Sequence, residues 1–333
     1  MLMNRNATIT GIGKYIPAKV LTNKDLEEMV ETSDDWITTR TGIKERRIAA
    51  EDEPTSELAI NASKKALEDA DLAPEDLDLI LVATVTPDMI FPATACILQE
   101  ALKANNASAF DLEAGCSGFV YALSTATQYI KTGMYDNILV VGAETLSKIT
   151  DWEDRSTCVL FGDGAGAAVL QPTDNNEGLL AFELGSDGKG ADVLKVPAGG
   201  SLQPASEETV NNKLHYIKME GNQVFKFAVK KMGSASLEVI ERAGFKPEDV
   251  NLFIPHQANT RIIEAAAKRL NLEDDKVFVN LPKYGNTSSA SVPIALIEAR
   301  EKGLINYGDI IVLVAFGAGL TWASTLIKWN MKN

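Results

Sequence analysis

Cys116 is the residue of this chain best placed for nucleophilic chemistry. It stands in the run GCSGF at 115–119, after a strand-like segment at 108–112 and at the start of a charge-free helical segment. A sulfur at a helix N-terminus faces unpaired N–H groups and the positive end of the helix dipole, which favour a thiolate. An unpaired cysteine is more often a small buried hydrophobe. The flanking glycines, however, are typical of a backbone that a ligand approaches closely.

Two further residues could act together with this sulfur. His256 follows the strand-like segment 250–255, at the carboxyl end where open α/β sheets bind ligands, and Asn286 lies in the turn-rich run KYGNTSS at 283–289. Taken singly, the histidine could be structural and the asparagine an ordinary turn or cap residue. Together the three suit acyl transfer, in which the sulfur carries an acyl group and two N–H donors stabilise an enolate oxygen. Loss of CO2 from a second substrate would supply the carbanion without a base.

An internal repeat relates the surroundings of these residues. The run PEDLDLIL at 74–81 matches PEDVNLFI at 247–254, and Cys116 and Asn286 each precede a glycine by 17 residues. The offsets of 173 and 170 are about half of the 333 residues. Chance similarity between short α/β units is the alternative. The repeat predicts two similar halves, 1–175 with the cysteine and 176–333 with the histidine and asparagine, related by a pseudo-twofold axis.

The elements that must position these residues alternate along the chain, which indicates an α/β fold with buried sheets. Strands are predicted at 77–83, 108–112, 137–142, 158–161, 166–170, 250–255, 276–280 and 309–315. Helices are predicted at 23–30, 56–70, 92–104, 117–132, 222–243, 258–269 and 288–302. The insertions 31–53 and 184–214 interrupt the duplication and are expected to be functional loops or binding rims.

Composition excludes several classes of function. The net charge of −14 argues against a nucleic-acid partner. Three cysteines and two histidines argue against a disulfide framework and a zinc site, so no metal or cofactor is expected. The apolar runs are of strand length and the first residues lack a signal-peptide core, so we expect a cytoplasmic protein without a membrane span.

Two glycine-rich runs need separate interpretation. GDGAG at 162–166 is flanked by apolar runs on both sides and is expected to connect strands, because a dinucleotide fingerprint needs a strand, a turn and then a helix. FGAG at 316–319 follows a strand and is either a tight turn or the source of an oxyanion-hole N–H.

Six motifs in order resemble the β-ketoacyl-acyl carrier protein synthase III family, the initiating condensing enzymes of type II fatty acid synthesis. They are GCSGF at 115–119, DRSTCVLFGDGAGAAVL at 154–170, EGNQVFKFAV at 220–229, IPHQANTRII at 254–263, YGNTSSAS at 284–291 and FGAGLTW at 316–322. The resemblance spans nearly the whole chain and implies the thiolase fold, a duplicated five-layer αβαβα arrangement. It also implies a catalytic triad of Cys116, His256 and Asn286. An asparagine at 286, where the elongating synthases have a second histidine, favours the initiating class.

The resemblance assigns further residues by position. It implies an oxyanion hole made by the backbone N–H groups of Cys116 and Ala318, where many members have glycine. Acyl-CoA would be bound by Thr32, Trp36, Arg40, Arg155, Gly221 and Asn259. The acidic carrier protein would dock on Lys226, Arg261 and Lys268, the last two on one helix face. Phe91, reaching across a homodimer interface, and Phe161 would line the acyl pocket.

The expected reaction therefore joins a short-chain acyl-CoA to malonyl-acyl carrier protein through an acyl-cysteine. A related Cys-His-Asn condensing enzyme of polyketide or ketone synthesis is the nearest alternative. A thioesterase is disfavoured because no base for water is evident, and a non-catalytic protein of the same fold is the third alternative. The choice between straight and branched starter groups stays open.

Overall fold

Two β-sheets form the centre of the molecule, which is a computed structural model describing residues 5–174 and 176–331. The strands of the larger sheet run in the order β1 (Arg5–Tyr15), β7 (Asp163–Asp174), β6 (Ile138–Thr145), β4 (Leu79–Ala83) and β5 (Ser108–Leu112). The smaller sheet has the order β11 (Leu252–Pro255), β12 (Ile310–Gly317), β13 (Thr321–Lys328) and β8 (Gly178–Ser186). Strands β5, β4 and β6 of the larger sheet are parallel, as are β11 and β12 of the smaller one, and the other neighbouring strands are antiparallel.

The smaller sheet repeats the larger one with one strand fewer. Strands β8, β13, β12 and β11 take the places of β1, β7, β6 and β4, and each PED run forms a 3-10 turn just before β4 or β11. The predicted strand at 276–280 lies where β5 would be expected by this correspondence. It pairs only through a single parallel bridge between Phe253 and Val277, because a 3-10 turn at Asp274–Lys276 occupies its start.

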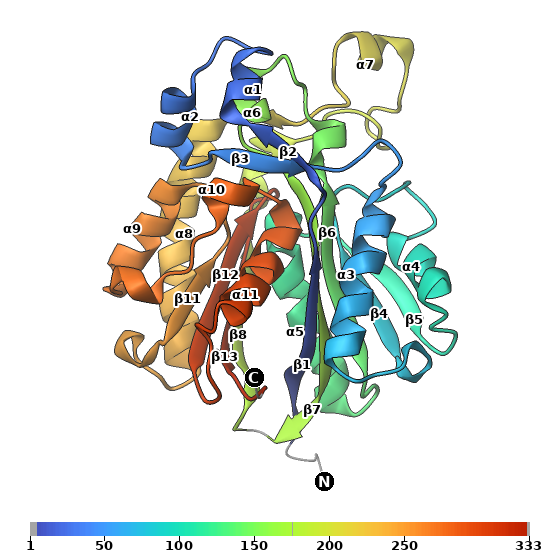
Figure 1. The fold of residues 1–333 in the computed structure, drawn as a ribbon, viewed down its shortest axis with the longest axis vertical. Coiled ribbons are helices and arrows are strands. Elements are labelled where there is room, and N and C mark those ends of the chain that lie inside the picture. The colour runs from blue at the N-terminus through green and yellow to red at the C-terminus, as the bar shows by residue number, and fades with distance from the viewer. Residues whose placement is uncertain (1–4, 175, 332–333) are drawn as a thin grey trace.

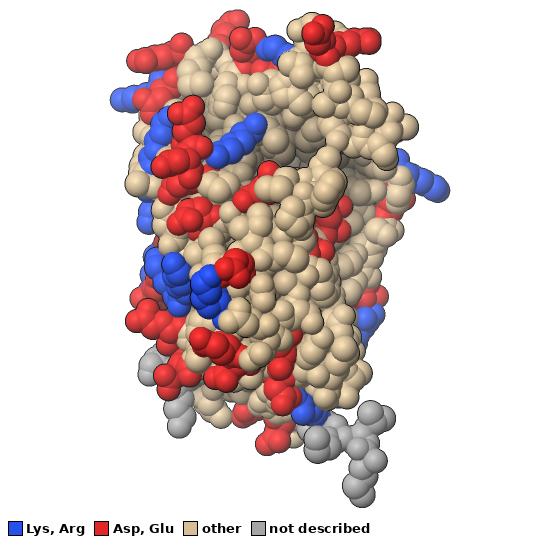
Figure 2. Space-filling view, turned by 90° about the vertical axis from the view of Figure 1, so that its right-hand side faces the viewer, with Lys and Arg blue, Asp and Glu red and all other residues tan. Residues whose placement is uncertain are grey.

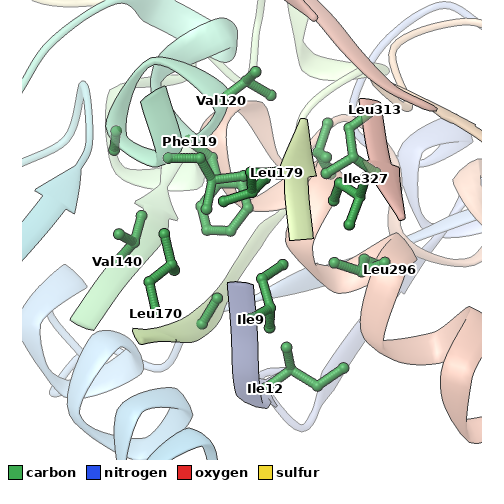
Figure 3. Close-up of a cluster of buried hydrophobic side chains, with 14 of the residues drawn as sticks. Ile9, Ile12, Phe119, Val120, Val140, Leu170, Leu179, Leu296, Leu313 and Ile327 are labelled. Carbon is green, nitrogen blue, oxygen red and sulfur yellow. The ribbon is translucent and has the colours of Figure 1, made fainter. Parts of the chain in front are cut away.

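Helices fill the space between the sheets and cover both outer faces (Figure 1). Between the sheets lie α5 (Gly118–Thr132) and α11 (Ser291–Glu301), whose apolar side chains join those of both sheets in one core cluster around Phe119. Figure 3 shows Phe119 between Leu179 of the smaller sheet and Val140 of the larger one. Helices α3 (Thr55–Asp69) and α4 (Thr94–Leu102) cover one outer face, and α8 (Gly221–Arg242) and α9 (Thr260–Leu270) the other. The result is the five-layer αβαβα arrangement that we expected.

The first insertion packs over one end of the sheets. It contains α2 (Asp34–Thr41) and β3 (Glu45–Ile48). Strand β3 pairs with β2 (Lys19–Thr22), which precedes the short helix α1 (Asn23–Glu27) and the insertion. The second insertion carries α7 (Glu207–Asn211) and the short strands β9 (Leu194–Lys195) and β10 (Lys218–Met219). The small helix α10 (Leu281–Tyr284) precedes Asn286.

Two local predictions were wrong. Residues 158–161 do not form a strand, because Asp154 caps the short helix α6 (Arg155–Cys158) and a turn at 159–160 follows it. The GDGAG run does not connect strands either, since β7 already begins at Asp163. Its glycines are needed for packing, because a Cβ at Gly166 would lie 2.7 Å from Pro293 of α11.

The boundary expected at residue 175 falls outside the described residues and stays a prediction. No helix among the described residues is long and apolar enough to cross a membrane. Over residues 5–174 and 176–331, the acidic, histidine and cysteine side chains form no cluster of three that could hold a metal ion.

Candidate active site

The thiol of Cys116 faces a cavity of about 610 Å³ at the end of the sheets. Residues of both halves line it, among them Phe161, Leu194, Ile217, Ser288 and Ala318. Its wall is mainly apolar, with Glu113, Asp111 and Lys195 among the polar exceptions. Such a space suits a short apolar group attached to the sulfur.

Close backbone packing explains the glycines around the cysteine. Gly115 has a φ of +55°, and a Cβ there would lie 2.7 Å from the backbone nitrogen of Ala318. A Cβ at Gly317 would overlap the backbone nitrogen of Cys116. The 3-10 turn Gly115–Ser117 therefore touches the end of β12, and the backbone N–H groups of Cys116 and Ala318 lie on adjoining segments.

Burial dominates the ionisation of the cysteine. It raises the pKa of the Cys116 thiol to about 12, with the Glu144 carboxyl adding to the shift and the Ser288 hydroxyl opposing it. The sequence led us to expect a thiolate stabilised by the start of α5. Burial acts against this expectation, because desolvation disfavours the charged form of the sulfur.

His256 is fully buried at the end of β11. Its backbone N–H donates to Val314 at 2.7 Å, and its ring meets Phe316 edge-on at 5.3 Å, next to the Gly317 segment that contacts Cys116. Its Nδ1 lies 2.6 Å from Ser291 Oγ, whereas Nε2 is buried without a partner among the described residues. Desolvation lowers the pKa of the imidazole to about 3, so the ring is neutral at physiological pH.

Asn286 is held by its backbone and by one side-chain atom. Its N–H donates to Leu160 at 2.8 Å, its carbonyl accepts from Gly162, and its Oδ1 accepts from the backbone N–H of Ser288 at 2.8 Å. These bonds orient the amide and leave Nδ2 available as a donor. Because Ser288 also lines the cavity beside Cys116, Asn286 lies next to the cavity wall, although neither Asn286 nor His256 lines the cavity itself.

Sequence reasoning missed Glu144, a fully buried carboxyl at the end of β6. It accepts hydrogen bonds from Thr86 Oγ1 at 2.7 Å, Ser288 Oγ at 3.0 Å and Ser289 Oγ at 2.7 Å, and burial raises its pKa. The carboxyl thus ties the turn after Asn286 to the larger sheet. A single charge in the otherwise apolar strand ILVVGAET was the available signal.

Three residues expected to bind CoA form one cluster. The guanidinium groups of Arg40 and Arg155 lie 4.9 Å and 5.0 Å from the ring centre of Trp36. Arg155 also donates to the Glu31 carbonyl at 2.8 Å. The cluster offers an aromatic plane and two cations where the first insertion meets α6.

The other three residues expected at the CoA site are more dispersed. Thr32 has a buried hydroxyl without a partner among the described residues, and Gly221 is the exposed first residue of α8. Asn259 caps α9 and donates from Nδ2 to the Arg40 carbonyl at 2.9 Å. None of these six residues lines the cavity around Cys116.

The remaining predicted residues lie on the surface or at the cavity. Lys226, Arg261 and Lys268 are exposed on the packed helices α8 and α9. Phe161 is 5% exposed and lines the cavity. Phe91 does not line it within this chain and is 83% exposed, although its neighbour Ile90 does.

Comparisons with known proteins identify the family. Models described as 3-oxoacyl-[acyl-carrier-protein (ACP)] synthase III and its C-terminal part match residues 110–188 and 240–329. The β-ketoacyl-[acyl-carrier-protein] synthase III of Caldanaerobacter subterraneus is 66% identical over 97% of this chain and 98% of its own length.

Solved structures give the same result. The 3-oxoacyl-[acyl-carrier-protein] synthase III of Aquifex aeolicus is 51% identical with a TM-score of 0.90, over 97% of this chain and all of the other. The priming β-ketosynthase of a polyketide pathway is 35% identical with a TM-score of 0.92, over 100% of this chain and 99% of the other. The thiolase fold is thereby confirmed, and the chain belongs to the 3-oxoacyl-[acyl-carrier-protein] synthase III family.

Proposed function

We propose that this chain catalyses the condensation that initiates fatty acid synthesis. A short-chain acyl-CoA and malonyl-acyl carrier protein would give 3-oxoacyl-acyl carrier protein, CoA and CO2. The observation that carries the proposal is the cavity lined by the partly buried Cys116, by Ala318 and by Ser288, whose backbone N–H holds the Asn286 side chain. The names of the relatives support the carrier protein as a substrate.

In the first half-reaction the Cys116 sulfur attacks the acyl-CoA carbonyl. A new S–C bond forms, the bond to the CoA sulfur breaks, and the thiol proton leaves with the CoA thiolate, so no net base is consumed. The N–H groups of Cys116 and Ala318 would stabilise the tetrahedral oxyanion. The pKa of about 12 means that this proton must move during the reaction rather than before it.

In the second half-reaction the malonyl thioester loses CO2. The electron pair of the broken C–C bond passes into an enolate, whose oxygen would accept from His256 Nε2–H and Asn286 Nδ2–H. The enolate carbon then attacks the acyl-cysteine carbonyl, a C–C bond forms as the S–C bond breaks, and the released thiolate takes one proton from solvent. A neutral imidazole is required for this role, and burial of His256 supplies it. The proposed reaction uses no metal or cofactor.

The surface residues suggest how the two substrates dock. The Trp36, Arg40 and Arg155 cluster would hold the CoA nucleotide by stacking and by charge, with Thr32, Gly221 and Asn259 along the pantetheine. Lys226, Arg261 and Lys268 would form a local positive site for an acidic carrier protein on a chain with net charge −14. We place the protein in the cytoplasm, where these substrates would be made.

A homodimer is proposed from one face of the molecule. Strand β5 is an unpaired edge of the larger sheet, and Met89, Ile90 and Phe91 beside the cavity are 48%, 82% and 83% exposed. Figure 2 shows this side of the molecule with a broad stretch carrying few charged side chains. A second copy would bury these side chains and let Phe91 contribute to the neighbouring acyl pocket. Phe91→Asp should therefore give monomers in light scattering, and an unchanged dimer would contradict this arrangement.

Intact-protein mass spectrometry tests the proposed reaction. Acetyl-CoA should add one acetyl group to the wild type and none to Cys116→Ala, while Asn286→Ala should still acylate but lose malonyl decarboxylation by roughly 100-fold. Acylation of Cys116→Ala would refute the nucleophile. An absent wild-type adduct would favour a non-catalytic protein of the same fold.

The second candidate is a priming enzyme of polyketide synthesis, supported by the 35% identical ketosynthase. Condensation with free malonyl-CoA as fast as with malonyl-acyl carrier protein would favour it. Net release of the free acid would instead revive a thioesterase. Comparing acetyl-CoA with isobutyryl-CoA would show which starter the cavity around Phe161 accepts.

A further inference from the structure

Ser291, the first residue of α11, contacts the catalytic candidate His256 without reaching the cavity. It is 2% exposed, and its Oγ lies 2.6 Å from His256 Nδ1. The same oxygen accepts a hydrogen bond from the backbone N–H of Gln257 at 3.2 Å. One hydroxyl therefore serves two consecutive residues after β11.

The donors and acceptors around this hydroxyl favour one arrangement. The Gln257 N–H can only donate, so it occupies one lone pair of Ser291 Oγ. His256 Nδ1 is the only other hydrogen-bond partner of this oxygen over residues 5–174 and 176–331. If Nδ1 carried a proton, Oγ would accept twice and its own buried proton would lack an acceptor, which is costly. If the hydroxyl donates to Nδ1, the hydroxyl, Nδ1 and the Gln257 N–H all have a partner.

The segment that presents Gln257 is itself fixed. The Gln257 side-chain Nε2 donates to the carbonyls of Pro255 at 2.7 Å and Phe278 at 3.2 Å. The side-chain Oε1 of the same residue accepts from the backbone N–H groups of Asn280 and Leu281. All four bonds are buried. The N–H of Gln257 is thus aimed at Ser291 by a rigid loop rather than by a mobile one.

We propose that Ser291 is a positioning residue, whose hydroxyl donates to Nδ1 and so fixes His256 as the tautomer that carries its proton on Nε2. This deepens the proposed function and rests on it for its purpose, since that tautomer alone can donate to an enolate oxygen from Nε2. The buried Nε2, which has no partner among the described residues, is the atom left to meet the substrate. The opposite tautomer would present a lone pair to the enolate and repel it.

Nitrogen NMR of the imidazole rings tests the tautomer directly, because the chain has only two histidines, His215 and His256. Protein labelled with 15N-histidine would be compared with a labelled His215→Asn variant to assign the signals. The wild type should show His256 with a protonated Nε2 and an unprotonated Nδ1 from pH 6 to pH 8. A proton on Nδ1 would overturn the proposal without any variant being needed.

Ser291→Ala and Ser291→Thr separate this role from a structural one. Loss of one net hydrogen bond shifts the tautomer ratio by roughly three- to tenfold in Ser291→Ala, and Thr, which keeps the hydroxyl, should restore it. Decarboxylation should fall by no more than this factor, because the rate follows the population of the Nε2–H tautomer, while Cys116 acylation stays within about twofold. An unchanged tautomer ratio in Ser291→Ala would refute the role of the hydroxyl. Because NMR needs no turnover, a failed acylation assay would refute the proposed function alone.

Discussion

Replacing Gly115 with alanine tests whether backbone contact between the two halves shapes the nucleophile site. At φ +55° an alanine pays the cost of the left-handed conformation, roughly 1–2 kcal/mol. Its Cβ would also stand 2.7 Å from the Ala318 nitrogen, inside the 3.0 Å that real Cβ atoms keep, so the two segments must separate. Overpacking of this kind adds about 1–3 kcal/mol. The variant should therefore lose about 2–5 kcal/mol of unfolding free energy in all.

Gly133 offers a matched control at the other end of α5. Its φ is +74°, but a Cβ there meets nothing within 4 Å, so Gly133→Ala should show the conformational cost alone. Urea unfolding would give both stabilities, and timed mass spectrometry with acetyl-CoA would give the acylation rates. Because the shift moves two oxyanion donors, Gly115→Ala should acylate roughly 10- to 100-fold more slowly, and Gly133→Ala within twofold of wild type. Equal stability and equal rates in the two variants would refute the reasoning.

Three further predictions concern the buried groups and the CoA cluster. Glu144→Ala should destabilise the fold by about 3–5 kcal/mol in urea unfolding, because it leaves several buried donors unpaired. Glu144→Gln, which keeps one acceptor oxygen, should lose less; equal losses would contradict this account. His256 has a pKa of about 3 when folded and 6.5 when unfolded, so its contribution to stability falls as pH drops below 6.5. Between pH 7 and pH 5 the wild type should lose about 2 kcal/mol more than His256→Asn, and an equal loss would mean that the ring is not desolvated. Trp36→Ala should raise the KM for acetyl-CoA by roughly tenfold with little change in kcat, and an unchanged KM would remove the cluster from the CoA site.

The sequence predicted the duplication well because both halves carry local signals of the same kind. The PED turns, the strands that follow them and the glycines that end α5 and α11 are all read from short windows. Gly133 and Gly303 have φ values of +74° and +70°, as expected for helix-ending glycines. Apolar runs also located the central strands to within a few residues.

The failures came where distant packing decides the local structure. Strands β1, β8 and β13 went unpredicted because Gly, Thr and Ala weaken their apolar pattern, although they pair along most of their length. Residues 276–280 have strand-like composition but gain only one bridge. Ser291 and Glu144 are single polar residues whose partners lie up to 145 positions away, so no local pattern could reveal them.

Cys116 lies at one corner of the proposed site and His256 at another, and burial acts on both side chains. Removing the site from water raises the pKa of the thiol and lowers that of the imidazole, so both groups rest in their neutral forms. A neutral thiol must lose its proton as it attacks, and a thioester suits this nucleophile because a thiolate leaves readily, whereas the nitrogen of an amide does not. A neutral imidazole brings no positive charge into the site, yet its N–H can donate a hydrogen bond to an oxygen that becomes negative. The same desolvation therefore favours transfer between thioesters at one corner and enolate stabilisation at the other, and it disfavours activation of water at both.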